Sequence, residues 1–173
     1  MPLSLNDPRW AQLSGSYGNT KDIVAWLSDA YAGGGMSEER LGELVNEVQR
    51  QGGTSTAMYA VAGHLLELAR AAEPKAALGL LTQAGCIHAA ARGLRAIPCP
   101  SFLEAEFLAS VRTGAKQLTA LLPDLNELAD FHYAVTGLAG LVGHHAFGRF
   151  LMGVNFYQGK FFHSSVEGEI SFD

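Results

Sequence analysis

Hydrophobic residues recur with helical spacing through most of the chain. The clearest run places one residue at each of i, i+3, i+4 and i+7, in the order Leu41, Leu44, Val45 and Val48. This spacing puts all four on one helix face. Ser37 stands before the run as an N-cap, and Glu38 and Glu39 suit the positive end of the helix dipole. We therefore predict a helix that begins after Ser37 and ends at Gly52-Gly53.

The same reasoning predicts further helices, each bounded by Gly or Pro. Their expected spans are Asn19 or Thr20 to Tyr31, Thr54 or Ser55 to Ala72, Pro74 to Gly93, Ser101 to Leu122, and Asp124 to Gly153. We expect the last helix to break either at 137–140 or at Gly143. Ser101 with Glu104, and Asp124 with Glu127, predict capping boxes. The first 18 residues are expected to be irregular.

The C-terminal segment has a different pattern. Residues 161–166 and 169–172 predict two short strands, with Glu167-Gly168 as the turn. An isolated hairpin is marginal in water, so this one must pack on the helices or on another chain. We expect a helical domain over 1–155 and a hairpin-like or extended tail over 156–173.

Helices of this length with short breaks form antiparallel pairs. The predicted fold class is all-α, either a short α-solenoid of HEAT-like pairs or an irregular bundle of antiparallel pairs. No strict sequence period is visible in the chain.

Composition narrows the classes of function. Net charge is −5, which argues against nucleic acid, because such binding depends on Lys and Arg at phosphates. Only 17% of the residues are charged and 48% are hydrophobic, so the helices either bury much of their surface or present an apolar patch to a partner. We find no uniformly apolar window of membrane-spanning length and no secretion signal at the N-terminus, and we expect a cytoplasmic protein.

Motifs for catalysis are weak. Cys86 and Cys99 are too few for a disulfide framework, and we expect two reduced thiols. Cys86 and His88 stand at i and i+2, which do not face each other on a helix. Gly33-Gly34-Gly35 lacks the Lys-Ser/Thr of a phosphate-binding loop, and no serine lies in a Gly-x-Ser-x-Gly elbow. We expect a protein that is not an enzyme and holds no cofactor.

Histidines supply the alternative hypothesis. Helix bundles can hold metals with inward-facing His and Glu side chains. The candidate ligands are His64, Glu67, His88, His132, His144 and His145. Against this reading, the chain has His-x-x-Glu once and no His-Glu-x-x-His. Surface or hydrogen-bonded core histidines are the simpler interpretation.

Aromatic residues gather near both ends of the chain, where exposed rings would anchor an interface. The candidates for partner contact are Trp10, Tyr17, Trp26, Tyr157, Phe161 and Phe162. Filling the first helical layer is the alternative role for the N-terminal rings. The tail aromatics also suggest a homodimer that forms through the tail.

Several short segments form a further pattern: Asp7-Pro8-Arg9-Trp10 with Leu13, Gly15 and Tyr17-Gly18; Leu41 to Leu44; Gln51-Gly52; Thr56-Ala57 with Tyr59-Ala60-Val61 and Leu65; and 137–143. Together they resemble bacterial HEAT-like helical repeat proteins of unknown function. This chain has Gln51 where those proteins usually have His. Some of them occur in toxin–immunity contexts. The resemblance implies a non-enzymatic scaffold that binds a toxin or another protein. The alternative is a bundle that binds a small molecule or a metal through its histidines.

Overall fold

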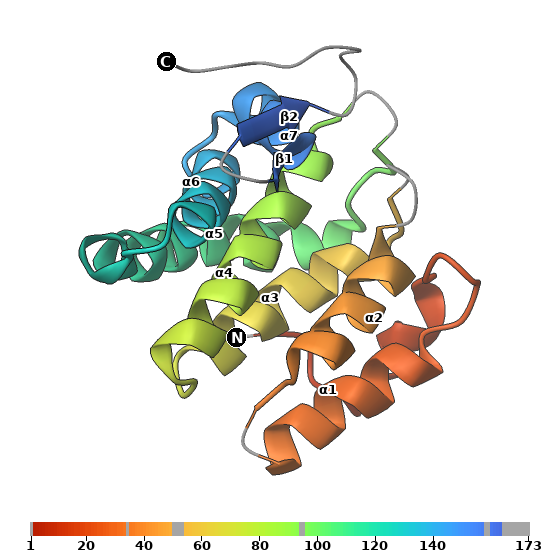
Figure 1. Cartoon of the computed structure of the whole chain (residues 1–173). Helices are drawn as coiled ribbons and strands as arrows, with labels where there is room; N and C mark the ends of the chain where they lie inside the picture. Colours follow the sequence, from red (N-terminus) through yellow and green to blue (C-terminus); the bar gives the residue numbers. More distant parts are fainter. Residues whose placement is uncertain (1, 34, 50–53, 94–95, 158–159, 164–173) are drawn as a thin grey trace.

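Seven α-helices make up most of the described part of the chain. The computed structural model describes residues 2–33, 35–49, 54–93, 96–157 and 160–163. The helices are α1 (Lys21–Gly33), α2 (Glu38–Val48), α3 (Ala57–Ala69), α4 (Pro74–Ala90), α5 (Ser101–Leu121), α6 (Leu128–Leu141) and α7 (His145–Met152) (Figure 1). Two 3-10 helices, η1 (Pro8–Gln12) and η2 (Leu122–Asp124), and two strands, β1 (Val154–Tyr157) and β2 (Lys160–His163), complete it.

These helices form three layers around α4. Helices α3 and α4 lie in the middle, with α1 and α2 on one side and α5 and α6 on the other (Figure 1). Helix α4 packs against α2, α3, α5, α6 and α7. The all-α prediction is confirmed apart from the short strands; the HEAT-like arrangement is not.

The starts of α2 and α4 follow the residues predicted for them. The Ser37 hydroxyl accepts the Arg40 backbone N–H at 3.2 Å, which confirms the N-cap of α2. Pro74 occupies the first turn of α4, where its missing N–H leaves no bond unmade.

Both predicted capping boxes are wrong. Ser101 already lies inside α5, whose N-cap is Pro100, and no side chain caps that end. Helix α6 begins at Leu128 with Glu127 as its N-cap, again without a side-chain bond. In each case the proline or 3-10 turn before the helix moves its start away from the residue that would cap it.

The break in the last helical stretch falls at Gly143. Helix α6 ends at Leu141 and α7 begins at His145. Gly143 has φ +92°, a left-handed conformation that glycine adopts without a steric penalty. Residues 137–140 remain helical, so the second of the two expected positions is the observed one.

The observed strands differ from the predicted strands. β1 and β2 pair antiparallel, with Val154 opposite His163 and Tyr157 opposite Lys160. The predicted first strand, 161–166, overlaps β2 only in part. The predicted second strand, 169–172, and its turn lie outside the described residues.

The described part of the N-terminal segment is irregular apart from η1, as predicted, and it is packed on the helices. Asp7 accepts the Arg9 backbone N–H at 2.9 Å and caps η1. Leu3, Trp10 and Leu13 are buried in the hydrophobic core. The segment therefore belongs to the core of the domain.

Glycines allow α4 and α6 to meet backbone to backbone. A Cβ atom on Gly85 of α4 would overlap the Gly137 carbonyl of α6, and a Cβ on Gly140 would overlap the Gly85 carbonyl. A Cβ on Gly137 would lie 2.7 Å from the Thr82 Cα. Because these clashes are with backbone, no side-chain rotation could relieve them. The close approach of α4 and α6 requires glycine at these positions.

We predict that Gly85→Ala lowers the free energy of unfolding by about 3 kcal/mol or more, because the added methyl must push α4 and α6 apart. Gly42→Ala is the matched control. Gly42 lies in α2 with open space around its Cβ position, so this change should raise the free energy of unfolding by roughly 0.5–1 kcal/mol. Urea unfolding followed by circular dichroism measures both. A Gly85→Ala protein as stable as the wild type would contradict the close contact.

Candidate protein-binding surface

His64 is a structural residue that holds the N-terminal segment to α3. Its Nε2 lies 2.9 Å from the Leu3 carbonyl oxygen, and its Nδ1 lies 3.0 Å from the Tyr31 hydroxyl. The Trp10 ring stacks on it, with centroids 6.0 Å apart. A carbonyl oxygen only accepts, so Nε2 donates and Nδ1 accepts from Tyr31. Both nitrogens are therefore engaged, and neither is left to ligate a metal.

His88 is also buried, and its ring forms a stacking contact and a hydrogen bond. Its ring stacks on Phe107, with centroids 4.0 Å apart, and its Nε2 lies 3.2 Å from the Ser110 hydroxyl oxygen. Ser110 donates its own proton to the Phe107 carbonyl at 2.7 Å. His88 must then donate to Ser110. A catalytic base would have to accept that proton instead, so this pair is not arranged as a nucleophile and base.

Burial keeps both histidines neutral. It lowers the pKa of His64 to about 4, although the bond to Leu3 partly opposes this. It lowers the pKa of His88 to about 3, and the positive charges of His145 and Arg92 contribute. Cys86, also on α4, is buried as well, which raises the pKa of its thiol to about 12. A thiol in that environment is a core residue rather than a nucleophile.

The structure does not gather the six candidate metal ligands. Glu67 forms an ion pair with Arg70 at 2.7 Å. His132 lies half-buried on α6, and His144 is exposed between α6 and α7. Among the described candidates, His145 contributes to lowering the pKa of His88, and His144 contributes to lowering that of His145. In the described ranges, no three His, Cys, Asp or Glu residues are placed to hold a metal ion.

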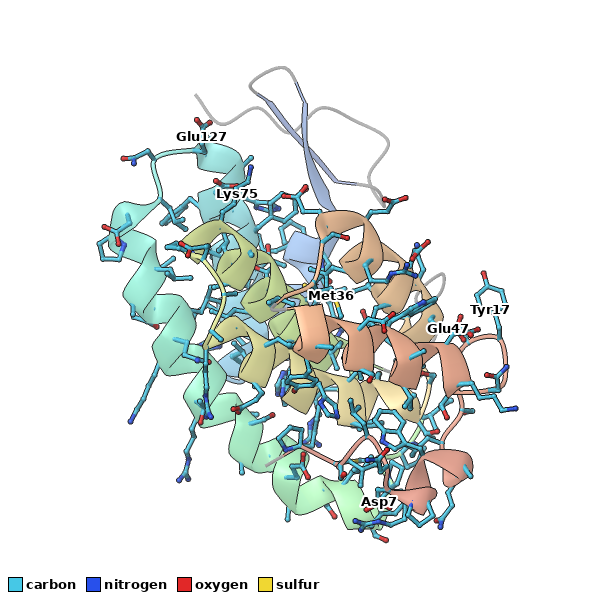
Figure 2. The ribbon with its side chains drawn as sticks, turned by 90° about the horizontal axis from the view of Figure 1, so that it is seen from below. Asp7, Tyr17, Met36, Glu47, Lys75 and Glu127 are labelled. Atoms are coloured by element: carbon cyan, nitrogen blue, oxygen red, sulfur yellow. The ribbon has the colours of Figure 1, made fainter. Side chains whose placement is uncertain are left out.

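The aromatic residues predicted to contact a partner differ in their exposure and surroundings. Trp10 is a core residue, and its indole N–H donates to the Ser4 carbonyl at 3.0 Å, so the prediction of an interface role for it is wrong. Trp26 is half-buried beneath the Arg40 guanidinium, which lies 5.3 Å from the ring centroid. Tyr17 is exposed and points away from the body near Glu47 (Figure 2). The side chains of Tyr157, Phe161 and Phe162 lie outside the described part.

Helix α7 carries an exposed apolar surface that the sequence analysis did not single out. We call Phe147, Phe150 and Met152 the α7 patch. The two rings are 52% and 46% exposed and stack on each other, with centroids 6.5 Å apart. Gly148, on the other side of this helix, packs against Ala89 and Gly140. Because α7 meets the domain through a glycine, its large side chains remain outside.

Helix α6 carries a second such surface. We define the α6 stripe as Leu128, Phe131, Val135, Leu138 and Val142. Of these, Leu128, Phe131 and Val142 are between 45% and 52% exposed, and the other two are half-buried. The buried residues of α6 are Leu141 and five small or polar residues, Ala134, Thr136, Gly137, Ala139 and Gly140. Several of the large apolar side chains of this helix are therefore exposed or half-buried.

Comparison with known proteins found no matching protein-family model, curated protein or solved structure. Across the described residues, no helix combines the length and the apolar character that a membrane crossing requires.

We predict that the free energy of unfolding decreases as the pH falls from about 6.5 to about 4. The unfolded chain takes up a proton on His64 over this range and the folded protein does not, so protonation favours unfolding. His64 alone should contribute about 3 kcal/mol to the decrease. The His64→Gln variant, which keeps an amide donor for Leu3 and does not titrate, should show a shallower decline.

Urea titrations at a series of pH values measure the effect. The control is His144→Gln, since His144 is exposed in the folded protein and the substitution removes no buried group. An unchanged pH profile in His64→Gln would contradict the prediction.

Proposed function

We propose that this chain is a protein-binding helical scaffold and that the α7 patch is its contact surface for a partner protein. The observation that carries the proposal is the stacked, half-exposed pair Phe147 and Phe150. Aromatic and Met side chains are enriched at the cores of protein interfaces. Contiguous exposed apolar patches on a monomer often mark interaction sites.

The helix arrangement supports a rigid presentation of this patch. Gly148 packs against Ala89 and Gly140, and Arg149 donates to the Ala89 carbonyl at 3.0 Å. These contacts anchor α7 to the end of α4. A preorganised surface loses less conformational entropy when it binds.

The chemistry of the buried histidines favours binding over catalysis. His64 and His88 are neutral, engaged in hydrogen bonds and directed into the core. The resemblance to HEAT-like proteins suggests the class of partner. We propose an immunity-type role, in which the partner is a toxin or another protein of the same competition system, met in the cytoplasm.

We predict that Phe147→Ser with Phe150→Ser weakens partner binding by roughly 100-fold or more, since truncation of an interface anchor typically removes about 2 kcal/mol. The tagged full chain first captures partners from an extract of the native host. The captured protein is then purified and its affinity measured by calorimetry with the wild type and the variant.

Leu108→Ser serves as the matched control, because Leu108 is equally exposed but lies on α5. It should bind as the wild type does. Equal affinity of the α7 variant, or no protein retained above the level of an unrelated helical bait, would contradict the proposal. Circular dichroism spectra of all three proteins should coincide.

A further inference from the structure

Residues 2–13, which we call the N-terminal strap, are attached to the helices through buried side chains and a few hydrogen bonds. The side chains of Leu3, Trp10 and Leu13 are buried. The Leu3 carbonyl oxygen lies 2.9 Å from His64 Nε2 on α3, and the Trp10 ring stacks on the same imidazole. Asp7, between these two anchors, lies at an outer edge of the molecule (Figure 2). One side chain of α3 therefore contacts two of the three anchors of the strap.

The surroundings of His64 fit only its neutral form. The side chain is 3% exposed, Nε2 donates to Leu3, and Nδ1 accepts from the Tyr31 hydroxyl. Protonation would add a second N–H at Nδ1, and the Tyr31 hydrogen would have to turn away from it. The ion pairs of the described residues do not include His64, so the new charge would be buried without a counterion. Detaching the strap would hydrate this ring and leave the helices in place.

The other charged groups near the strap do not favour its release at mildly acidic pH. Burial raises the pKa of the Glu106 carboxyl on α5, and a hydrogen bond from the Leu3 backbone partly opposes the increase. A raised pKa means that falling pH favours the attached strap through Glu106, which opposes the effect of His64. Hydrogen bonds from Arg9 lower the pKa of Asp7 to about 2, so Asp7 titrates in stronger acid. Glu67 on α3 is paired with Arg70.

We propose that the N-terminal strap is a pH-sensitive latch, in which protonation of His64 releases residues 2–13 from α3 while the helices stay folded. The release ends at Ser14. Its backbone N–H donates to the Thr56 hydroxyl at 2.7 Å and its carbonyl accepts the Ala57 N–H at 3.1 Å, and neither bond involves a titratable group. Pro2 forms part of the wall of a cavity of about 280 Å³ between α3 and α5, so release widens this cavity. The inference is independent of the proposed function, because the α7 patch lies on a different helix.

Hydrogen exchange measured by mass spectrometry tests the latch. The backbone N–H groups of Asp7, Trp10 and Leu13 are bonded within the strap. A 3-10 helix of five residues does not keep such bonds once it leaves the core, so these groups report release. A Glu106→Gln background removes the opposing carboxyl and keeps an acceptor for Leu3. There, the equilibrium constant for release should rise roughly 20-fold from about pH 7.5 to about pH 5, after correction for the intrinsic exchange rate.

Two variants assign the effect to His64. His64→Gln keeps an amide donor for Leu3 and does not titrate, so its strap should exchange with almost no dependence on pH. His144→Gln, at an exposed position, should keep the full dependence. Low concentrations of urea should barely change exchange in the strap but accelerate it in α4, because release exposes much less surface than unfolding. A strap that responds to urea as α4 does, or to pH equally in His64→Gln, would overturn the proposal.

Nuclear magnetic resonance of the unmodified chain provides a test that needs no variant. The Trp10 indole N–H donates to the Ser4 carbonyl at 3.0 Å within the strap, so its signal reports whether the strap is attached. This signal should change over the same pH range as the ring signals of His64. Titration of His64 with no change at Trp10 would show that the ring takes up its proton beneath an attached strap, and would overturn the latch.

Discussion

The contact between the backbones of α4 and α6 is the constraint on which the rest of the arrangement depends. Gly85, Gly137 and Gly140 leave no room for a side chain between the two helices. Packing at this distance brings many main-chain atoms into van der Waals contact, and each adds a small attraction. It also fixes the rotation of α6 about its own axis. Once the small residues face α4, the large apolar residues must face elsewhere.

The exposed surfaces of this protein follow from that rotation. On α6, Leu128, Phe131 and Val142 of the stripe are exposed, and on α7 the inward Gly148 leaves Phe147 and Phe150 outside. On both helices several large apolar side chains therefore lie at the surface. The apolar area left in water is the physical basis of the proposed binding role.

Polar groups inside the domain serve packing. His64 joins the N-terminal segment, α1 and α3 through Leu3, Tyr31 and the stacked Trp10 ring. Each of these bonds satisfies a buried group that would otherwise lose its hydration without compensation. The same bonds use the nitrogens that a metal or a catalytic step would need. The chemistry of this core is therefore consistent with a scaffold rather than a reaction centre.

Local sequence patterns determined the helices, because apolar periodicity, the Ser37 cap, Pro74 and Gly143 act over a few residues. They also indicated the all-α class, and the composition indicated a low fraction of charged residues. Only the tertiary structure decided that Trp10 is buried, that His64 binds Leu3 across the chain, and that Phe131 on α6 is exposed. These outcomes depend on which helix faces meet. When a helix is apolar on most of its circumference, its local sequence does not indicate which face will be buried. In α6 the backbone contact at three glycines decides which face is buried.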